Sequence, residues 1–494
     1  MPTPDRHSEI TGGDITTIQL LSATKQRAFI RSLQSALGAQ GSLSSLTPGP
    51  SENVFVIPQV VEATVRASLA LISASQWHGQ LISWGALTVN TLKRDAFFSL
   101  MERGAVVING IPLGTAKIAA VVPVPVSKAA ANNQILPASF RGPFDWNLDD
   151  RGCNVVAAWQ MFANEPKFSA ALPWAAIRIG HIDTGYTEHA ALGWANGASS
   201  TVKPAEGYDY WDGAHDPVPP DPRDEWLPGF PGHGTRISGA IAGFAAQTPN
   251  QPFYGVAPGV TIVPYRVTDS VIIDHVKGNV SSAIRQAVVD KCHIINISLG
   301  ALFGSKALAS ALDYAYDNGV IVCCAAGQVW GEVIYPGRYN RCITMGGVGP
   351  GLKPWSSGAK GQYVDLCGPA DVIRRVKAEQ LPAGQAAQGL HPKADGDGTS
   401  YATATCSGIA ALWLAWHGAD TLKSHFSKSG LWQIPKAFKQ LARQTATPGG
   451  WAAADNGNYG SGVLNAANLL TGLLPDDGSM TKALLAADVF DNND

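Results

Sequence analysis

The feature that most constrains the fold is a regular alternation of apolar runs and helix-like segments that begins near residue 175. The apolar runs contain few polar residues, as expected of strands that are covered on both faces of a parallel sheet. They span residues 175–182, 260–267, 292–299 and 320–325, and the helix-like segments span residues 234–244, 280–289 and 307–316. Strands separated by helices in this way predict an α/β domain, with a parallel sheet between two layers of helices.

Changes of composition divide the rest of the 494-residue chain. We expect a polar N-terminal segment over residues 1–51, a small α+β module over 52–117 and a proline-containing linker over 118–142. The α/β domain is then expected over 143–474, followed by an acidic tail over 475–494 that frays at the end of the chain.

The charge balance excludes several classes of partner. The formal net charge is −2 and no long basic run occurs, which argues against both a nucleic-acid groove and a polybasic membrane anchor. No apolar stretch approaches the 18 residues of a transmembrane helix. We therefore expect no nucleic-acid or membrane partner.

The N-terminus and the cysteines suggest a compartment. The first thirty residues lack the charged, apolar and small-residue regions of a secretory signal peptide. The seven cysteines are an odd number, have no C-x-x-C pair and lie mostly in apolar runs, so we expect buried, reduced thiols. Both observations favour a cytoplasmic protein, although export by another route stays open.

Three short segments place a reactive residue type among glycines, at the end of a strand or the start of a helix. Asp183 ends a predicted strand, where open α/β sheets bind their ligands. His233 lies between two glycines, which let partners approach both sides of the imidazole. Ser400 opens the apolar run 400–416, which predicts a central buried helix with unpaired N–H groups at its start. Taken alone, each has a structural explanation: a turn, a satisfied histidine or a helix cap. The other ten histidines lack such a setting, and we interpret them as surface or structural residues.

The chain order Asp183, His233, Ser400 is the order of the subtilisin-type triad, and it differs from those of chymotrypsin and the α/β-hydrolases. Further segments are similar to subtilase motifs in the same order: WNLD at 146–149, YGVAP at 254–258, NISLG at 296–300, AAG at 325–327, YPG at 335–337 and YGSGVLNAA at 459–467. The sequence thus resembles the subtilisin-like serine peptidases, or subtilases, from about residue 144 to 470.

This resemblance implies a fold and a set of roles. Ser400 would attack a peptide carbonyl, His233 would transfer the proton, and Asp183 would orient the imidazole. An extended substrate would pair with the backbone of Ser298, Leu299 and Gly300. The opposite wall of the substrate site would be formed by Ala325, Ala326 and Gly327.

Departures from the family pattern affect the residues around this machinery. The family normally has an asparagine after the wall segment, whose amide donates to the oxyanion; this sequence has Gln328. Gln328 carries the same donor on a longer side chain, so we expect a shifted but working oxyanion hole, with an impaired or specialised enzyme as the alternative. After the serine, Tyr401 stands where methionine is usual, and Cys406 is interpreted as a packing residue.

An acidic, proline-rich loop precedes His233 and contains Asp212, Asp216, Asp221, Asp224 and Glu225. Family members often bind calcium, and loop carboxylates are suitable ligands, but no EF-hand spacing occurs. We expect a solvated loop and no required cofactor or metal, with a calcium site possible but not placed.

The resemblance predicts a regulated serine endopeptidase acting on protein or peptide substrates. The α+β module is similar in element order to the subtilase propeptide, so the chain's own N-terminal region is a candidate inhibitor; an unrelated accessory domain is the alternative. Two other functions stay open: a peptide ligase or macrocyclase on the same triad, and a catalytically silent peptide-binding scaffold.

Overall fold

The computed structural model describes residues 145–482, apart from 169–171, 196, 213–220, 227–228, 245–252, 329–330, 383 and 392–395, together with the backbone of four N-terminal strands. Nearly all of the expected α/β domain lies within these residues.

Seven parallel strands form the central sheet, in the spatial order β13-β12-β11-β10-β5-β9-β8. They are β5 (Arg178–Asp183), β8 (Tyr208–Asp209), β9 (Thr261–Arg266), β10 (Ile294–Ile297), β11 (Ile321–Ala325), β12 (Cys342–Val348) and β13 (Leu366–Pro369). This confirms the predicted parallel sheet. Strands β8 and β9 lie on one side of β5, and β10 to β13 lie on the other. Successive strands of the chain are therefore added first on one side of β5 and then on the opposite side.

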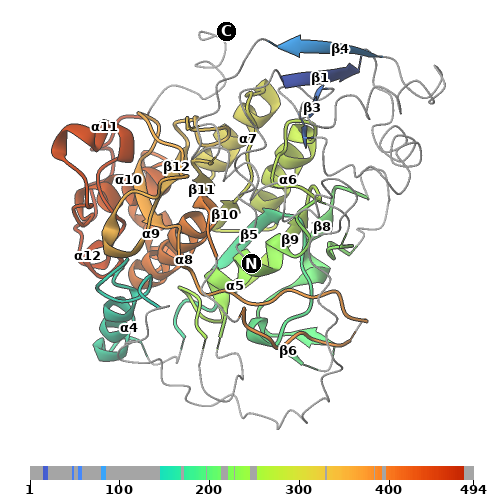
Figure 1. Ribbon diagram of the computed structural model, residues 1–494. Helices are drawn as coiled ribbons and strands as arrows, with labels where there is room; N and C mark the ends of the chain where they lie inside the picture. The colour runs from blue at the N-terminus through green and yellow to red at the C-terminus, as the bar shows by residue number, and fades with distance from the viewer. Residues whose placement is uncertain are drawn as a thin grey trace, which may run out of the picture.

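Helices cover both faces of the sheet, as Figure 1 shows. Helices α5 (His233–Ala242) and α8 (Thr399–His417) pack on one face, in an apolar cluster that includes Ile179 of β5 and Ile294 of β10. Helices α6 (Lys277–Val289) and α7 (Lys306–Asp317) pack on the other face, in a cluster that includes Ile182 and Ile295. Alternate residues of each strand thus belong to the two separate cores. Because both faces of the strands are buried, their sequences are unbroken apolar runs.

Helix α8 is the buried central helix that the sequence predicts. It contacts five strands of the sheet, β5 and β10 to β13, and helices α4 (Val155–Asn164) and α12 (Ala466–Leu470) pack against it. The other described elements are α9 (Ala419–His425), α10 (Gln433–Gln444), α11 (Asn456–Tyr459), β6 (Trp194–Ala195) and β7 (Ala198–Ser199). Among the described residues, no helix combines the length and the apolar character needed to cross a membrane.

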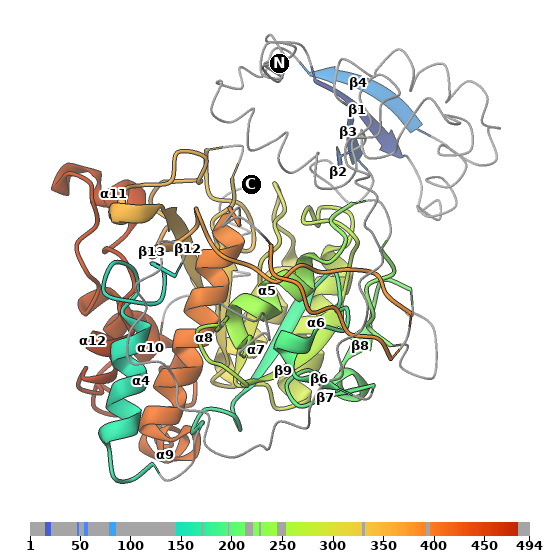
Figure 2. The ribbon, with the colours of Figure 1, turned by 60° about the horizontal axis from the view of Figure 1, so that its bottom comes forward.

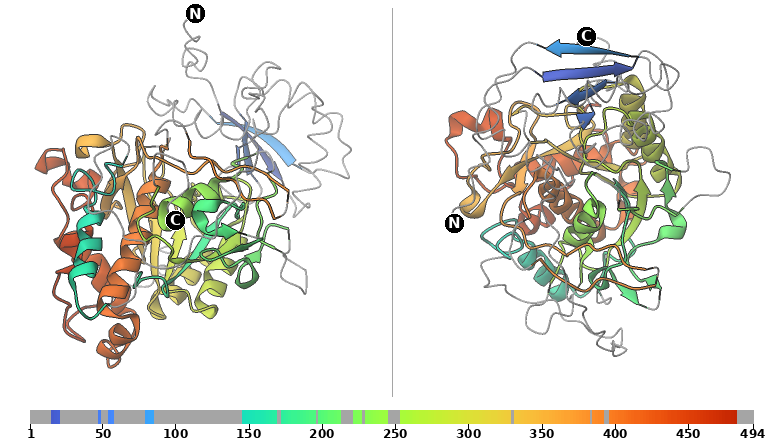
Figure 3. Two further views of the ribbon diagram at one scale, coloured as in Figure 1. Left: turned by 90° about the horizontal axis from the view of Figure 1, so that it is seen from below. Right: turned by 45° about the vertical axis from the view of Figure 1, so that its right-hand side comes forward.

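The N-terminal strands form a second, antiparallel sheet in the order β2-β3-β1-β4, separate from the large sheet in Figures 2 and 3. They are β1 (Ile15–Leu20), β2 (Thr47–Pro48), β3 (Val54–Ile57) and β4 (Gly79–Trp84). Because β1 pairs with both β3 and β4, the boundary expected at residue 51 is wrong: it would divide this sheet. The polar composition of residues 1–51 hid a short run of β-favouring isoleucines and threonines. The rest of the α+β module expected over 52–117 lies outside the described residues.

The C-terminal boundary expected at residue 474 is too early. The Asp477 carboxylate accepts hydrogen bonds from Gln433 Nε2 at 2.7 Å and from the Lys428 N–H at 3.1 Å. Met480 is buried against the core, and Lys482 forms an ion pair with Asp317 at 2.6 Å. Residues 475–482 therefore belong to the domain, and the rest of the expected tail lies outside the described residues.

The seven cysteines are all free and buried, which confirms the structural part of that expectation. Cys406 of α8 lies in the core with its Sγ 3.5 Å from the Cys323 Sγ, in agreement with a packing role.

A buried histidine outside the site makes the stability of the fold depend on pH. His189 is fully buried; its Nδ1 accepts the Ala191 N–H at 3.1 Å and its Nε2 donates to the Gly389 carbonyl at 3.0 Å. Burial lowers the pKa of His189 from 6.5 to about 4, so the unfolded ring takes up a proton before the folded one does. We expect this residue to remove about 3 kcal/mol of unfolding free energy between pH 6.5 and about 4.

Urea unfolding of the wild type and of His189→Gln at pH 7 and 4.5 checks this expectation. The variant should lose less unfolding free energy on acidification than the wild type does, since glutamine does not titrate. Equal losses in the two proteins would contradict the assignment.

Candidate active site

The candidate site lies at β5 and β10, where the order in which strands are added to the sheet reverses. Asp183 is the last residue of β5, and Ser298 follows the last residue of the neighbouring strand β10. In open α/β sheets, the carboxyl ends of strands at such a reversal form the crevice that binds ligands. The topology therefore brings the predicted aspartate and one predicted substrate segment to the same edge.

Asp183 and His233 form a direct contact. Asp183 Oδ1 lies 2.7 Å from His233 Nδ1 and also accepts the Thr184 N–H at 2.8 Å. Asp183 is buried, with 1% of its surface exposed, and burial alone would raise its pKa. The nearby His233 and His181 rings outweigh this effect and hold the pKa of Asp183 well below its usual range. The carboxylate is therefore ionised and accepts the His233 Nδ1–H.

The glycines around His233 have a steric reason. Gly232 precedes α5 with φ 72°, a left-handed conformation that favours glycine. Helix α5 begins at His233, and a Cβ on Gly234 would lie 2.0 Å from the Gly185 carbonyl oxygen. The absence of side chains at both positions lets the start of α5 approach the loop after β5, and this brings the ring to Asp183.

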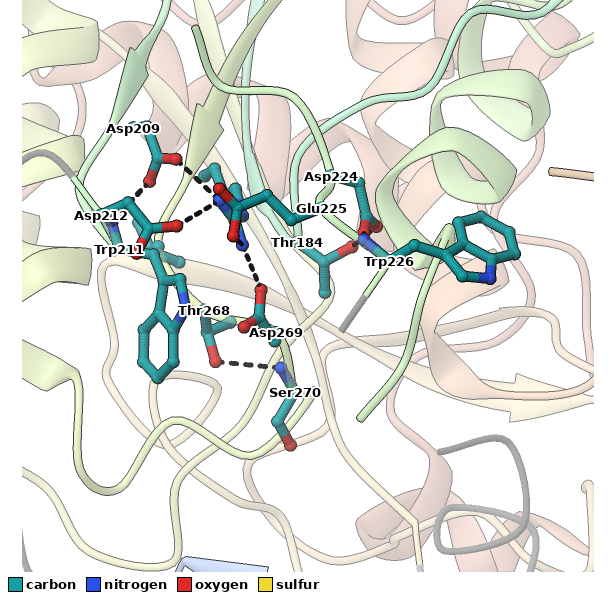
Figure 4. Close-up of polar contacts among 12 residues, drawn as sticks. Thr184, Asp209, Trp211, Asp212, Asp224, Glu225, Trp226, Thr268, Asp269 and Ser270 are labelled. Atoms are coloured by element: carbon teal, nitrogen blue, oxygen red, sulfur yellow. Dashed lines mark hydrogen bonds and ion pairs between the residues drawn. The ribbon is translucent and has the colours of Figure 1, made fainter. Parts of the chain in front are cut away.

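Asp224 connects the two loops that carry Asp183 and His233. Its Oδ2 accepts the Gly232 N–H at 2.7 Å. Its Oδ2 also accepts the Thr184 hydroxyl at 3.1 Å, and its Oδ1 accepts the Trp226 N–H at 2.8 Å (Figure 4). The Thr184 hydroxyl in turn accepts the Gly234 N–H at 3.1 Å. Asp224 is buried, so the expectation that it belongs to a solvated loop is wrong.

Asp212 and Glu225 of the loop converge on Arg266, together with Asp209 and Asp269 from outside the loop. Arg266 is a fully buried side chain at the end of β9. Its guanidinium contacts Asp269 at 2.6 Å, Asp212 at 2.7 Å, Asp209 at 2.8 Å and Glu225 at 3.4 Å; Figure 4 shows these carboxylates gathered together. Asp221 accepts the Tyr186 hydroxyl at 2.8 Å, and Asp216 lies outside the described residues. The protein's own donors thus engage the described carboxylates of the loop, and the described part of the chain contains no group of three or more His, Cys, Asp or Glu side chains that could hold a metal ion.

Ser400 is the second residue of α8. Its Oγ donates to the Ser298 carbonyl at 3.2 Å, and the Ser298 hydroxyl donates to the Ser400 carbonyl at the same distance. Within the described part of the chain, no hydrogen bond joins the Ser400 hydroxyl to the His233 ring. The three predicted residues thus comprise one bonded pair and a serine whose hydroxyl points to β10.

The start of α8 supplies polar groups around Ser400. Gln328 Oε1 accepts the Thr399 N–H at 3.1 Å, which fixes the carbonyl end of this amide beside the start of α8. The Thr399 hydroxyl accepts the Gly327 N–H at 3.2 Å. Gln328 therefore lies beside the helix start that carries Ser400, where an amide donor and the first-turn N–H groups can act on one anion.

In both predicted substrate segments, hydrogen bonds within the protein already occupy some of the backbone groups. The Gly300 N–H donates to the Val271 carbonyl and the Gly300 carbonyl accepts the Ile273 N–H, both at 2.9 Å. A substrate strand that pairs with Gly300 would therefore have to displace residues 271–273. The Ala326 carbonyl accepts the Ile334 N–H and the Gly327 carbonyl accepts the Ala359 N–H, so this wall can contribute shape rather than strand pairing.

Sequence reasoning missed His181, which it grouped with the structural histidines. His181 is buried two positions before Asp183, and its Nε2 lies 3.3 Å from Asp183 Oδ2. Alternation along a strand was the available signal, since residues i and i+2 share a face.

Comparison with known proteins now places the chain in a family. Residues 175–462, more than half of the chain, match the model of the subtilase family. The chain therefore belongs to the subtilase family, as the sequence motifs indicate.

The chain spans about half the length of several curated relatives that it matches. It is 29% identical to subtilisin E of Bacillus subtilis (strain 168) over 247 residues, which are 49% of this chain and 56% of that protein. It is 26% identical over 290 residues to the thermostable alkaline protease of Halalkalibacterium halodurans, with coverage of 58% and 66%. The crystal structure of MycP1 from Mycobacterium smegmatis has 20% identity and a TM-score of 0.49, covering 71% of this chain and 90% of that chain.

Proposed function

We propose that the chain is a serine endopeptidase that cleaves peptide bonds through an acyl-enzyme. The observation that carries the proposal is the 2.7 Å contact between the buried Asp183 carboxylate and His233 Nδ1, at the sheet edge that also contacts the start of α8. An ionised carboxylate on Nδ1 leaves Nε2 of the neutral ring as the base, which suits proton transfer to and from a serine.

In the proposed reaction, the Ser400 hydroxyl turns from the Ser298 carbonyl toward His233 and loses its proton to Nε2. A bond forms between Oγ and the substrate carbonyl carbon, and the carbonyl oxygen becomes an oxyanion. The bond to the leaving amine then breaks as His233 returns the proton to the nitrogen. Water attacks the acyl-enzyme by the same route, and Asp183 stabilises the imidazolium in both halves.

Two donors are available for the oxyanion: the Ser400 N–H and Gln328 Nε2. Gln328 Oε1 is already bonded to the Thr399 N–H, which holds the amide beside the helix start that carries Ser400. We expect Gln328→Ala to lower kcat by about 10²- to 10³-fold with little change in KM, the magnitude known for the amide donor of subtilisin itself. Steady-state kinetics on a chromogenic peptide checks this, with Gln328→Asn as the control that keeps an amide. An alanine variant within threefold of the wild type would remove Gln328 from the oxyanion hole.

The N-terminal region is proposed to regulate this activity. The small antiparallel sheet of β1 to β4 belongs to a separate unit that precedes the peptidase domain, as an inhibitory segment would. The proposal is tested by adding residues 1–142 to a chain that begins at 143 and measuring hydrolysis. Inhibition supports regulation, whereas unchanged rates support an accessory domain. Seven free, buried cysteines support a reducing, cytoplasmic location as part of the same proposal.

The products distinguish the proposed hydrolysis from its two alternatives. The purified chain is incubated with a peptide, with and without a second peptide that offers a free amine, and the products are weighed by mass spectrometry. Hydrolysis gives fragments whose summed mass exceeds the substrate by one water. Joined or cyclised products identify a ligase, and binding without any product identifies a scaffold.

A further inference from the structure

We propose that His181 is a positioning residue of the active site, which holds the Asp183 oxygen that His233 does not contact. This inference rests on the proposed peptidase function. His181 is not part of the triad pattern with which the sequence was compared. With it, the site contains a second histidine beside His233.

The geometry places the carboxylate between two imidazole rings. His181 and Asp183 are two positions apart on β5 and point to the face that α5 and α8 cover. Asp183 Oδ1 is 2.7 Å from His233 Nδ1, and Asp183 Oδ2 is 3.3 Å from His181 Nε2. Both partners of the second contact are almost completely buried, at 2% and 1% exposure.

The far side of the His181 ring fixes its tautomer. His181 Nδ1 lies 2.9 Å from the Ser238 hydroxyl of α5. With that hydroxyl as the donor, Nδ1 is the acceptor and the ring proton resides on Nε2, which faces Asp183. Among the described residues, Asp183 Oδ2 and His181 Nε2 are buried polar atoms with no hydrogen-bond partner elsewhere. Each is therefore the group available to satisfy the other, and a small closing movement completes the bond.

His181 acts on the pair of Asp183 and His233, because Asp183 lies between the two rings. Asp183 on the same strand contacts the His181 ring, and His233 on α5 lies on the other side of that carboxylate. The other elements packed around it contribute neutral groups: Ser238 of α5, Pro264 of β9 and Asn296 of β10, which are register partners of His181, and Ser407 of α8, which donates to Asn296.

Removing the Nε2 donor has two consequences. The carboxylate loses one of the contacts that fix its plane, so the His233 ring is aligned less well for proton transfer. More of the Asp183 charge then acts on the His233 ring, which changes the surroundings of the proton that the two residues share.

The test compares two amides that mimic different ring nitrogens. His181→Gln places an amide nitrogen near the position of Nε2 and can still donate to Asp183. His181→Asn places its amide near the position of Nδ1, where the amide oxygen can accept the Ser238 hydroxyl, and it does not reach the carboxylate. We expect His181→Asn to lower kcat by about 10- to 100-fold with little change in KM. His181→Gln should stay within about threefold of the wild type.

Equal kcat values for His181→Asn and His181→Gln would overturn the proposal, because a purely structural role predicts no difference between the two amides. Ser238→Ala covers the case in which the asparagine variant does not fold: it keeps the ring but removes the donor that fixes the tautomer. We expect a fall in kcat of about 3- to 10-fold, and wild-type kinetics would also overturn the proposal.

A readout that does not need turnover separates this inference from the proposed function. The proton between His233 Nδ1 and Asp183 should give a low-field ¹H NMR signal that is lost in His233→Ala. This signal should shift in His181→Asn and stay in place in His181→Gln. If the wild type cleaves no peptide, the proposed function fails, and the NMR shifts still decide whether His181 holds Asp183.

Discussion

Ser400→Ala is expected to lower kcat for peptide hydrolysis by about 10⁴-fold or more, with an unchanged fold. The proposed acyl-enzyme forms on the Ser400 oxygen, and no other group of the site can replace that atom. The Ser400 hydroxyl makes one hydrogen bond, to the Ser298 carbonyl at 3.2 Å, so its loss should change the free energy of unfolding by only about 0.5 kcal/mol. Hydrolysis of a chromogenic peptide and the thermal midpoint measure the two effects.

Thr405→Ala is the matched control for this variant. Thr405 lies on the same helix, and its hydroxyl donates to the Tyr401 carbonyl at 2.9 Å within the buried part of α8. This control should retain hydrolysis within about threefold, because the residue does not contact the reacting atoms. Retained hydrolysis in Ser400→Ala itself would refute the serine as nucleophile.

Arg266→Met is expected to have the largest effect on stability, a loss of about 3–5 kcal/mol at pH 7. Methionine fills similar volume but carries no charge, so it leaves the Asp209 and Asp269 carboxylates buried without their cation. Burial already raises the pKa of Asp269 to about 6 in the presence of Arg266. An acid with a raised folded-state pKa stabilises the fold as pH falls, so the deficit of the variant should shrink at pH 5.

Urea unfolding at pH 7 and pH 5 measures this effect, and Arg285→Met is the control. Arg285 is an exposed arginine that donates to the Ser310 hydroxyl at 2.8 Å, and its replacement should change stability by less than about 0.5 kcal/mol. A loss below 1 kcal/mol in Arg266→Met, or a deficit that grows toward pH 5, would contradict the account of the buried cluster.

The sequence predicted those parts of the fold that repeat a simple physical pattern. Apolar runs such as 292–299 become strands of a doubly covered sheet, and the run 400–416 becomes α8, because burial on all sides removes any polar stripe. Asp183 and His233 could be paired in advance through the resemblance of their chain order to the subtilisin-type triad, and the structure shows that the glycines beside them permit the close approach.

The contacts that depend on folding of loops could not be predicted. Asp224 joins the loop after β5 to the start of α5 from a segment that looked like a solvated acidic loop, since composition does not reveal which carboxylate meets backbone N–H groups. The pairing of Gly300 with residues 271–273 is a long-range contact between irregular segments. The strand β1 joins a sheet with β3 and β4 across more than thirty residues, and average composition cannot register such pairing.

The most direct test of the account is labelling of the folded chain with a fluorophosphonate, followed by intact-mass analysis and mapping of the adduct. The account predicts one adduct, located on Ser400, which is absent from Ser400→Ala and formed much more slowly in His233→Ala. The same comparison is made on the chain that begins at residue 143, so that inhibition by the N-terminal region does not hide the nucleophile. An adduct on another residue, or equal labelling of His233→Ala and the wild type, would contradict the assignment of Asp183, His233 and Ser400 as the catalytic residues.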